Sequence, residues 1–391
     1  MSCESSDHVA PPPELNFTLV TQREINSTPH DWSSAEIQSQ LPTDILLITA
    51  NDHEFNACYS YMKDVRRGYS TKLGMVDFGQ FGDQSNENVK VALIKCAQGS
   101  SKAQTAVTNA AGILYPKVVL FVGLCATMKP TKAKLGDVVI SAKLATYDNK
   151  KVMADGRDLY RGIKVNVSKN MADLILHADD GWEPPLKDPS SLKFEVHRDA
   201  VMLSGPELVD YRERREELLN SFPDALGLEM EGKGLYEAAY NLSIEWAVIK
   251  AVSDFADGSE ERTKLWQPFS SAIAASVVYN MFKYPVVLRH WPHHKETEDP
   301  KVNRKEKKKE KKKQKKSDFN DIETGHKMHN GRTIEYSVTS RDFFDYDEYD
   351  AKVRDVATGE TAERTLCFTK KGAMDGAIED LFKQLREKKL I

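Results

Sequence analysis

The chain has 391 residues, of which 40% are hydrophobic and 29% are charged. This length allows two or three ordinary domains, and the hydrophobic content is enough for a sizeable core. The formal net charge is −4, but residues 301–316 carry ten Lys, one Arg and two Glu, so the rest of the chain is clearly acidic. An acidic body with one basic segment is not the charge pattern of a protein that binds nucleic acid across a broad face.

The cysteines and the N-terminal residues predict where in the cell the protein is located. The five cysteines are widely spaced and form no Cys-x-x-Cys pair, which argues against a disulfide framework or a zinc site. Residues 1–13 lack the apolar stretch of a signal peptide, and no run approaches the roughly 18 apolar residues of a membrane span. We therefore expect a soluble protein without metal or redox cofactor. Its location would be cytoplasmic, or nuclear through the Lys-rich segment.

The first segment of the chain is polar. Residues 1–40 are rich in Ser, Pro, Asn, Gln and Asp, and we predict a flexible N-terminal segment. From Leu41 to Pro285, short apolar runs alternate with amphipathic stretches, which indicates a parallel or mixed sheet covered on both faces. The predicted strands are Asp44–Ala50, Val89–Cys96, Val118–Gly123, Asp137–Ser141 and Ile244–Val252, and the predicted helices are Lys102–Leu114, Tyr211–Phe222, Gly232–Leu242 and Ser270–Phe282.

Beyond Pro285 the pattern changes twice. Residues 286–317 are predicted to be a linker, in which Lys301–Lys316 is a solvated charge run or a contact for an anionic partner. Residues 318–391 regain alternation and end in an amphipathic helix, so we predict a small α+β module of unknown role. The expected elements there are strands at Thr333–Ser340, Tyr349–Val356 and Arg364–Thr369 and a helix at Lys371–Lys388.

Acidic residues follow three elements of the main domain. They lie in three short stretches: Thr49–Glu54 after the first predicted strand, Gly227–Gly232 at the start of a helix, and Ser253–Gly258 after a late strand. One acid in such a place often caps the next helix. Three such groups together favour a site, because ligands of open α/β sheets bind beyond the carboxyl ends of the strands.

Several motifs in register resemble the nucleoside phosphorylase/nucleosidase superfamily over roughly residues 43–285. They are Val-Gly-Leu-Cys-Ala at 122–126, Lys-Leu-Gly-Asp-Val-Val-Ile-Ser at 134–141, Glu-Met-Glu-Gly at 229–232 and Lys-Ala-Val-Ser-Asp at 250–254. The resemblance implies a three-layer α/β domain with a central, mostly parallel twisted sheet, which cleaves the N-glycosidic bond of a purine nucleoside or nucleotide. It also implies a homo-oligomer.

The resemblance assigns roles to individual residues. Asp254 would protonate the departing purine, Glu231 would bind the ribose hydroxyls, and Glu54 would position the attacking water. Met230 would pack on the ribose, although a core methionine is the alternative. Further substrate contacts are expected from the loop residues Gly123 and Ala126 and from the base-flanking residues Leu208 and Val209. An aromatic is usual at the first flanking position, so Trp266 or Phe269 could supply an aromatic wall, unless both are ordinary core residues.

The nucleophile divides this superfamily into hydrolases and phosphorylases. The phosphorylases carry arginines that hold phosphate. Here Phe121 stands where one such Arg would be and Leu124 replaces a Ser, so an apolar pair takes their place, and Glu54 would repel phosphate. Hydrolysis is therefore favoured over phosphorolysis. A non-catalytic nucleotide sensor is the alternative class, but such a protein need not retain Glu54, Glu231 and Asp254 together.

Polar residues suggest a phosphorylated substrate. Where methylthioadenosine/adenosylhomocysteine nucleosidases have apolar residues, this chain has Asn51 and Gln98. Gln98 opens a loop with Ser100, Ser101 and Lys102 at a helix start, which could cradle phosphates or could simply be a capped surface helix. The resemblance is greatest to nucleosidase domains of immune and stress receptors, some of which cleave ATP. ATP is thus one predicted substrate, with Mg²⁺ only as its counterion, and methylthioadenosine is another.

Overall fold

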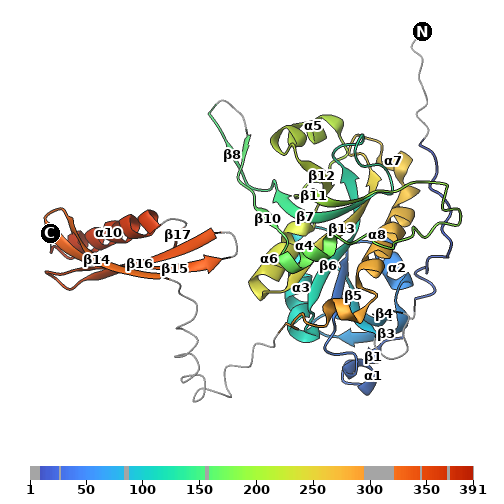
Figure 1. Cartoon of the computed structure of the whole chain (residues 1–391), viewed down its shortest axis with the longest axis horizontal. Helices are drawn as coiled ribbons and strands as arrows, with labels where there is room; N and C mark the ends of the chain where they lie inside the picture. Colours follow the sequence, from blue (N-terminus) through green and yellow to red (C-terminus); the bar gives the residue numbers. More distant parts are fainter. Residues whose placement is uncertain are drawn as a thin grey trace, which may run out of the picture. The chain divides into compact units, whose positions relative to one another are not determined.

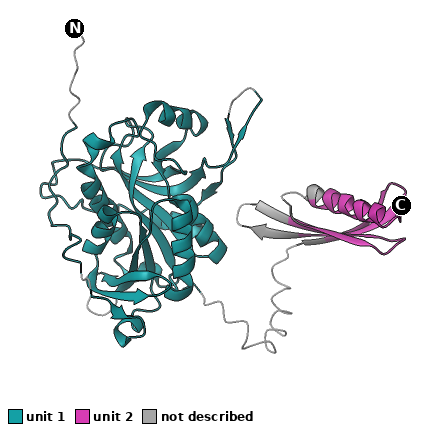
Figure 2. Cartoon of the chain, turned by 180° about the vertical axis from the view of Figure 1, so that it is seen from behind, with its two compact units in different colours: residues 1–297 teal, residues 298–391 magenta. Residues whose placement is uncertain are grey.

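The computed structural model describes residues 9–25, 28–82, 88–154, 158–294, 321–343, 346–367 and 370–390. The chain divides into two compact units, residues 1–297 and 298–391 (Figure 2). The Lys-rich segment at 301–316, with its expected anionic partner, lies outside the described residues. Within the described ranges, no helix is long and apolar enough to cross a membrane.

A mixed sheet forms the centre of the first unit, where eleven described strands join in the order β1-β3-β4-β5-β2-β6-β12-β11-β7-β10, and β13 pairs with both β6 and β7. Because β13 bridges β6 and β7, the strands β6, β12, β11, β7 and β13 close into a ring of pairings. The strands are β1 (His30–Asp31), β2 (Ile45–Thr49), β3 (Lys63–Ser70), β4 (Gly74–Phe81), β5 (Val89–Lys95), β6 (Val118–Thr127), β7 (Val138–Thr146), β10 (Lys164–Asn166), β11 (Val196–Ser204), β12 (Ala225–Glu229) and β13 (Glu245–Asp254), with β8 (Lys150–Val152) and β9 (Asp158–Tyr160) pairing as a separate hairpin.

Helices cover the sheet on both sides. Helix α2 packs against α8, and α3 packs against α6 on the opposite side of the sheet (Figure 1). The helices are α1 (Ala35–Gln38), α2 (Asp52–Ser60), α3 (Ser100–Leu114), α4 (Lys169–Ile175), α5 (Arg212–Ser221), α6 (Gly232–Leu242), α7 (Glu260–Thr263) and α8 (Trp266–Phe282), followed by the 3-10 helix η1 (Pro285–Leu288). The predicted three-layer α/β arrangement is confirmed.

Continuous apolar stretches became the central strands for a simple reason. All five residues of β2 are buried, as are nine of the ten residues of β6. A strand with neighbours on both edges and helices on both faces has no solvent side, so it does not alternate between apolar and polar residues.

The prediction of a flexible N-terminal segment over residues 1–40 is wrong for its described part. Ile25 and Ile37 are buried in the main core, and Leu15 pairs with Leu186 in an isolated β-bridge. A few well-placed apolar side chains attach this polar segment to the domain. At the other end, Leu288 is buried and Trp291 packs against the core, so the first part of the predicted linker belongs to this unit.

The second unit is the expected small α+β module. Four antiparallel strands, in the order β14-β15-β16-β17, carry helix α10. Its core joins Ile334 and Val353 of the sheet to Leu381 and Leu385 of the helix. The elements are β14 (Asp321–His329), β15 (Arg332–Phe343), β16 (Tyr346–Asp355), β17 (Thr361–Cys367) and α10 (Lys370–Glu387). Strand β14 escaped the sequence analysis because it is an edge strand of largely polar residues.

Candidate active site

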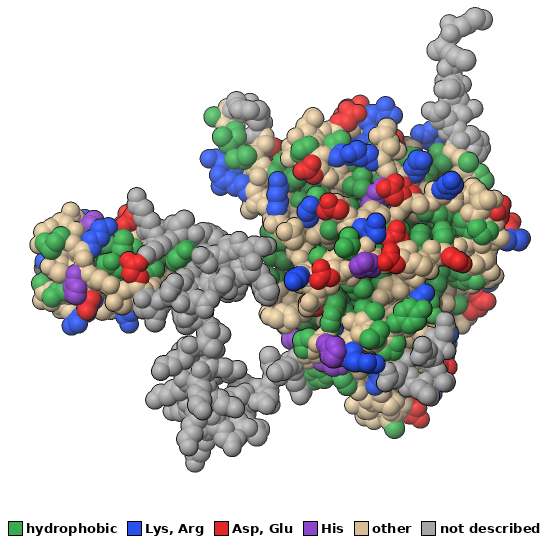
Figure 3. All heavy atoms as spheres, viewed as in Figure 1, with side chains coloured by type: hydrophobic (Ala, Val, Ile, Leu, Met, Phe, Trp, Pro, Cys, Tyr) green, Lys and Arg blue, Asp and Glu red, His purple; other side chains and the backbone are tan. Residues whose placement is uncertain are grey.

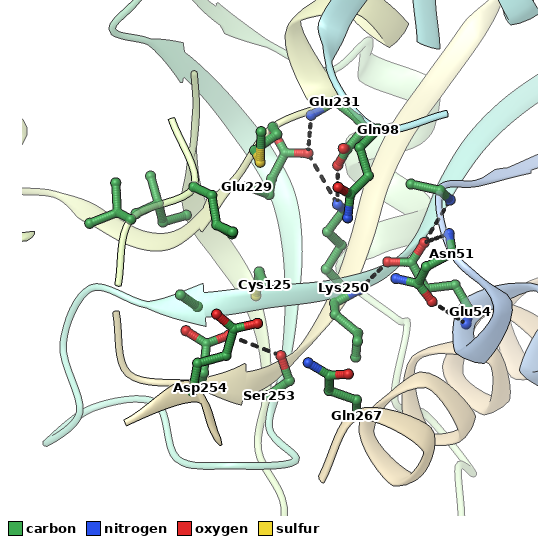
Figure 4. A pocket seen from close by; sticks show the side chains of 18 of the residues that line it. Asn51, Glu54, Gln98, Cys125, Glu229, Glu231, Lys250, Ser253, Asp254 and Gln267 are labelled. Atoms are coloured by element: carbon green, nitrogen blue, oxygen red, sulfur yellow. Dashed lines mark hydrogen bonds and ion pairs between the residues drawn. The ribbon is translucent and has the colours of Figure 1, made fainter. Parts of the chain in front are cut away.

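One pocket opens where β2, β6, β12 and β13 end, and it gathers residues from all three acidic stretches (Figure 4). Of the predicted site residues, nine line it: Asn51, Glu54, Gln98, Ala126, Leu208, Val209, Met230, Glu231 and Asp254. Further lining residues that the sequence analysis did not assign to the site include Glu207, Glu229, Lys250, Ser253, Glu260 and Gln267.

Asp254 is the last residue of β13. Its carboxylate accepts hydrogen bonds from the Ala256 amide at 3.1 Å and from the Ser253 hydroxyl at 3.1 Å. Burial raises the pKa of Asp254 to about 6, while these two hydrogen bonds work in the opposite direction. A carboxyl group with this pKa can hold a proton near neutral pH and then release it, as a general acid must.

This raised pKa links Asp254 to stability. Its contribution to the free energy of unfolding should be fully present below pH 3.8 and should be lost as the pH rises through about 6, because the folded state disfavours the ionised form. We therefore expect Asp254→Asn to become more stable relative to the wild type between pH 4 and pH 8, as measured by urea unfolding. If the difference in the free energy of unfolding between variant and wild type did not change with pH, the pKa of Asp254 would not be raised.

Glu231 is held by a buried lysine. The Lys250 ammonium lies 2.7 Å from Glu231 and 3.3 Å from Glu229, and it sits 4.8 Å from the centre of the Phe121 ring. Burial works to raise the pKa of Glu231, but Lys250 and the amide of Gly99, 3.0 Å away, hold this pKa below its usual value. Glu231 is thus a fixed anion that faces the pocket.

Glu54 is buried and held by the backbone. Its carboxylate accepts hydrogen bonds from the amides of Ala50 at 2.7 Å, Asn51 at 3.2 Å and Leu124 at 2.9 Å, and Asn51 completes a capping box at the start of α2. Burial raises the pKa of Glu54, Lys250 lowers it, and the net direction is upward. A rigid carboxylate with a raised pKa suits a group that orients water and accepts its proton.

Gly123 does not line the pocket, but it makes room for Glu54. A Cβ atom at position 123 would lie 1.9 Å from Oε1 of Glu54 and 2.2 Å from its Cδ. The absence of a side chain at Gly123 therefore lets the Glu54 carboxylate reach the amide of Leu124.

Gly123→Ala should consequently displace Glu54. Because misplacing a catalytic group by about 1 Å can cost about 10²-fold in rate, we expect a loss of that order in kcat for the reaction proposed below. The matched control is Gly112→Ala in α3, where a Cβ atom meets nothing within 4 Å. If both variants retained full kcat, the position of Glu54 would not matter for the reaction.

The pocket lining includes apolar residues, among them the two that the resemblance places beside the base, Leu208 and Val209. Val209, Ala126 and Leu228 are buried, whereas Leu208 is 72% exposed. Met230 lines the pocket beside Glu231, where the resemblance places the ribose.

Trp266 and Phe269 do not supply an aromatic wall. Both are buried in the main core, where their rings meet edge to face at 5.5 Å, and the Trp266 indole donates to the Ala10 carbonyl at 2.9 Å. The core alternative is therefore the correct interpretation. Their neighbour Gln267 faces the pocket instead.

The loop after Gln98 does not form the expected phosphate cradle inside the pocket. Gln98 lines the pocket, but the Gly99 amide is bound to Glu231 and the Ser100 hydroxyl donates to the Met230 carbonyl at 3.0 Å. Ser101 and Lys102 are exposed at the start of α3, outside the lining. The amide of Gly99, the N-cap residue of α3, is thus bound to Glu231 and not directed to a phosphate.

Lys250 is the most important residue that the sequence analysis missed as a site residue. A signal was present, because Lys250 is a charged residue inside the apolar run of β13, and a buried charge needs a partner. Among the described residues, no group of three or more His, Cys, Asp or Glu side chains is arranged to hold a metal ion.

Comparison with known proteins identifies this arrangement. The sequence profile of the phosphorylase superfamily matches residues 44–278, more than half of the chain. The chain belongs to the phosphorylase superfamily. The profile begins after the N-terminal segment and ends before the second unit, so both lie outside the matched residues.

Relatives within the phosphorylase superfamily include nucleosidases. A death domain-containing ATP nucleosidase of Amphimedon queenslandica is 29% identical over 60% of this chain, a match that spans about half (47%) of the relative's length. A 5′-methylthioadenosine/S-adenosylhomocysteine nucleosidase of Staphylococcus carnosus is 25% identical over 45% of this chain and 74% of its own. The solved structure of such a nucleosidase from Neisseria meningitidis, in complex with methylthio-immucillin-A, shares the fold, with a TM-score of 0.50, 20% identity and coverage of 62% of this chain and 99% of its own.

Proposed function

We propose that this chain is a purine nucleosidase, which hydrolyses the N-glycosidic bond of an adenine nucleoside or nucleotide. The observation that carries the proposal is the meeting of three carboxyl groups of different character in one pocket. Asp254 titrates near pH 6, Glu231 is held as an anion, and Glu54 is fixed by the backbone.

Each group has one task in the proposed reaction. Asp254 gives its proton to the purine as the bond between base and ribose breaks and the electron pair leaves with the base. Glu231 accepts hydrogen bonds from the ribose hydroxyls, and these bonds strengthen as the ring gains positive charge. Water then adds to the ribose carbon, and Glu54 receives its proton.

Water is favoured over phosphate as the nucleophile by the charges in the pocket. Its lining carries six carboxyl groups, those of Glu54, Glu207, Glu229, Glu231, Asp254 and Glu260. The one cation among the described lining residues is Lys250, which is already bound to Glu229 and Glu231. A phosphate dianion would meet repulsion and find no arginine to bind it.

Adenine is the base that we propose, and ATP is the first nucleotide to test. The name of the Amphimedon queenslandica relative supports ATP, and Asn51 and Gln98 give the pocket a polar side. Because of the carboxyl groups around it, we expect a nucleotide to bind as its Mg²⁺ complex, with the metal as a counterion. We also propose that this reaction serves a defence or stress response, as the resemblance to nucleosidase domains of immune and stress receptors implies.

The test is adenine release, followed by chromatography, from ATP, AMP, adenosine and methylthioadenosine, with and without phosphate. Release without phosphate supports hydrolysis, and release that requires phosphate would make the chain a phosphorylase. Release from ATP in the presence of Mg²⁺ supports the nucleotide substrate. Release from adenosine or methylthioadenosine alone would exclude ATP, and binding without release from any substrate would favour a sensor.

A further inference from the structure

The N-terminal segment from residue 9 to residue 25, here called the strap, runs along the surface of the first unit. Leu15, Leu19 and Val20 are partly buried against the core, and only Ile25 at its end is buried. The middle of the strap is bound to the segment around Pro185, whose carbonyl accepts from the Asn16 amide at 3.0 Å. The two ends of the strap make further hydrogen bonds to helices of the domain.

One end of the strap is attached to helix α8. The Ala10 carbonyl accepts a hydrogen bond from the Trp266 indole, and Trp266 is the first residue of α8. The next residue, Gln267, lines the pocket. The strap therefore holds the turn of α8 that presents a side chain to the active site.

The other end of the strap is attached to helix α2. The side-chain amide of Gln22 donates from Nε2 to Oδ1 of Asn56 at 2.8 Å and to Oδ1 of Asp52 at 3.3 Å. The backbone amide of Val20 donates to the Ser60 hydroxyl at 2.9 Å. Asp52 is the first residue of α2, which is only nine residues long and carries Glu54 in its first turn. Gln22 thus ties the strap directly to the turn that places Glu54.

We propose that the strap is a positioning element for the active site, and that Gln22 is the positioning residue that acts through α2 on Glu54. This inference rests on the proposed function. The superfamily profile begins at residue 44, so the strap lies outside the matched residues. It adds an external brace across α2 and α8, which pack against each other and both contribute residues to the pocket.

The test compares two exposed strap residues. Gln22→Ala removes the hydrogen bonds to Asp52 and Asn56 and keeps the bond between Val20 and Ser60 at the end of α2. Glu14→Ala removes a 2.7 Å ion pair with Lys187 that involves neither helix. We expect Gln22→Ala to lower kcat about 3- to 10-fold with little change in KM, since small displacements of catalytic groups act on rate. Glu14→Ala should leave both constants unchanged, and both variants should melt within a few degrees of the wild type.

Two further measurements separate positioning from general loosening. In the Gln22→Ala and Asn56→Ala pair, the effects on kcat should not add, because both variants break the same contact. Hydrogen exchange should quicken at the amides of Glu54 and Phe55 in Gln22→Ala but not in Glu14→Ala. Equal effects of both variants, or unchanged kcat and exchange in Gln22→Ala, would overturn the proposal. If the wild type released no purine, the proposed function would fail, and the exchange measurement would still test the brace.

Discussion

Replacing Asp254 with asparagine is expected to lower kcat for purine release by about 10²- to 10⁴-fold, the usual contribution of a general acid. The amide has nearly the same shape but cannot give up a proton to the leaving base. Substrate binding should persist, because Glu231 and the apolar walls are unchanged. In the wild type, kcat/KM should fall as the pH rises above about 6, where Asp254 loses its proton.

The control for this variant is Asp257→Asn. Asp257 lies in the segment that follows Asp254 but does not line the pocket, and its carboxylate accepts from the Ser259 hydroxyl at 2.5 Å. We expect it to retain nearly full activity. An Asp254→Asn protein that released adenine at the wild-type rate would remove Asp254 from the mechanism and leave the purine without a proton donor.

Lys250→Met is expected to have the largest effect on stability, a loss of about 3–5 kcal/mol in the free energy of unfolding. The side chain of Lys250 is 2% exposed, and its removal leaves the carboxylates of Glu229 and Glu231 buried without their cation. Activity should fall as well, because Glu231 loses the charge that orients it. Unfolding in urea, followed by circular dichroism, measures the first effect.

The pH dependence of this loss gives a direct check on its cause. In the wild type, the lowered pKa of Glu231 contributes stability above its unfolded pKa, and this contribution is lost as the pH falls. Without Lys250, the buried Glu231 should prefer its neutral form, so the difference in the free energy of unfolding between variant and wild type should narrow toward acidic pH. The surface variant Lys233→Met, which breaks ion pairs with Asp148 and Glu237, should cost no more than about 1 kcal/mol. Equal losses in the two variants would contradict the assigned role of Lys250.

The local pattern of apolar and polar residues was sufficient to predict the central strands of this domain and its acidic site residues. The strands β2, β5, β6 and β13 are recognisable in the sequence as apolar runs, because strands buried on both faces have no polar side. The predicted strands also placed Asp254, Glu231 and Glu54 in one site, because these residues follow strands whose ends meet at one edge of the sheet.

Tertiary structure alone decided which groups pair. Lys250 and Glu231 are 19 residues apart, the Gly99 amide and Glu231 are 132 apart, and Ala10 and Trp266 are 256 apart. No local pattern encodes such contacts, because each depends on how two elements are brought together. For the same reason the sequence did not reveal that Glu231 would bind the Gly99 amide at the N-cap of α3, or that a polar N-terminal segment would make hydrogen bonds to the helices of the active site.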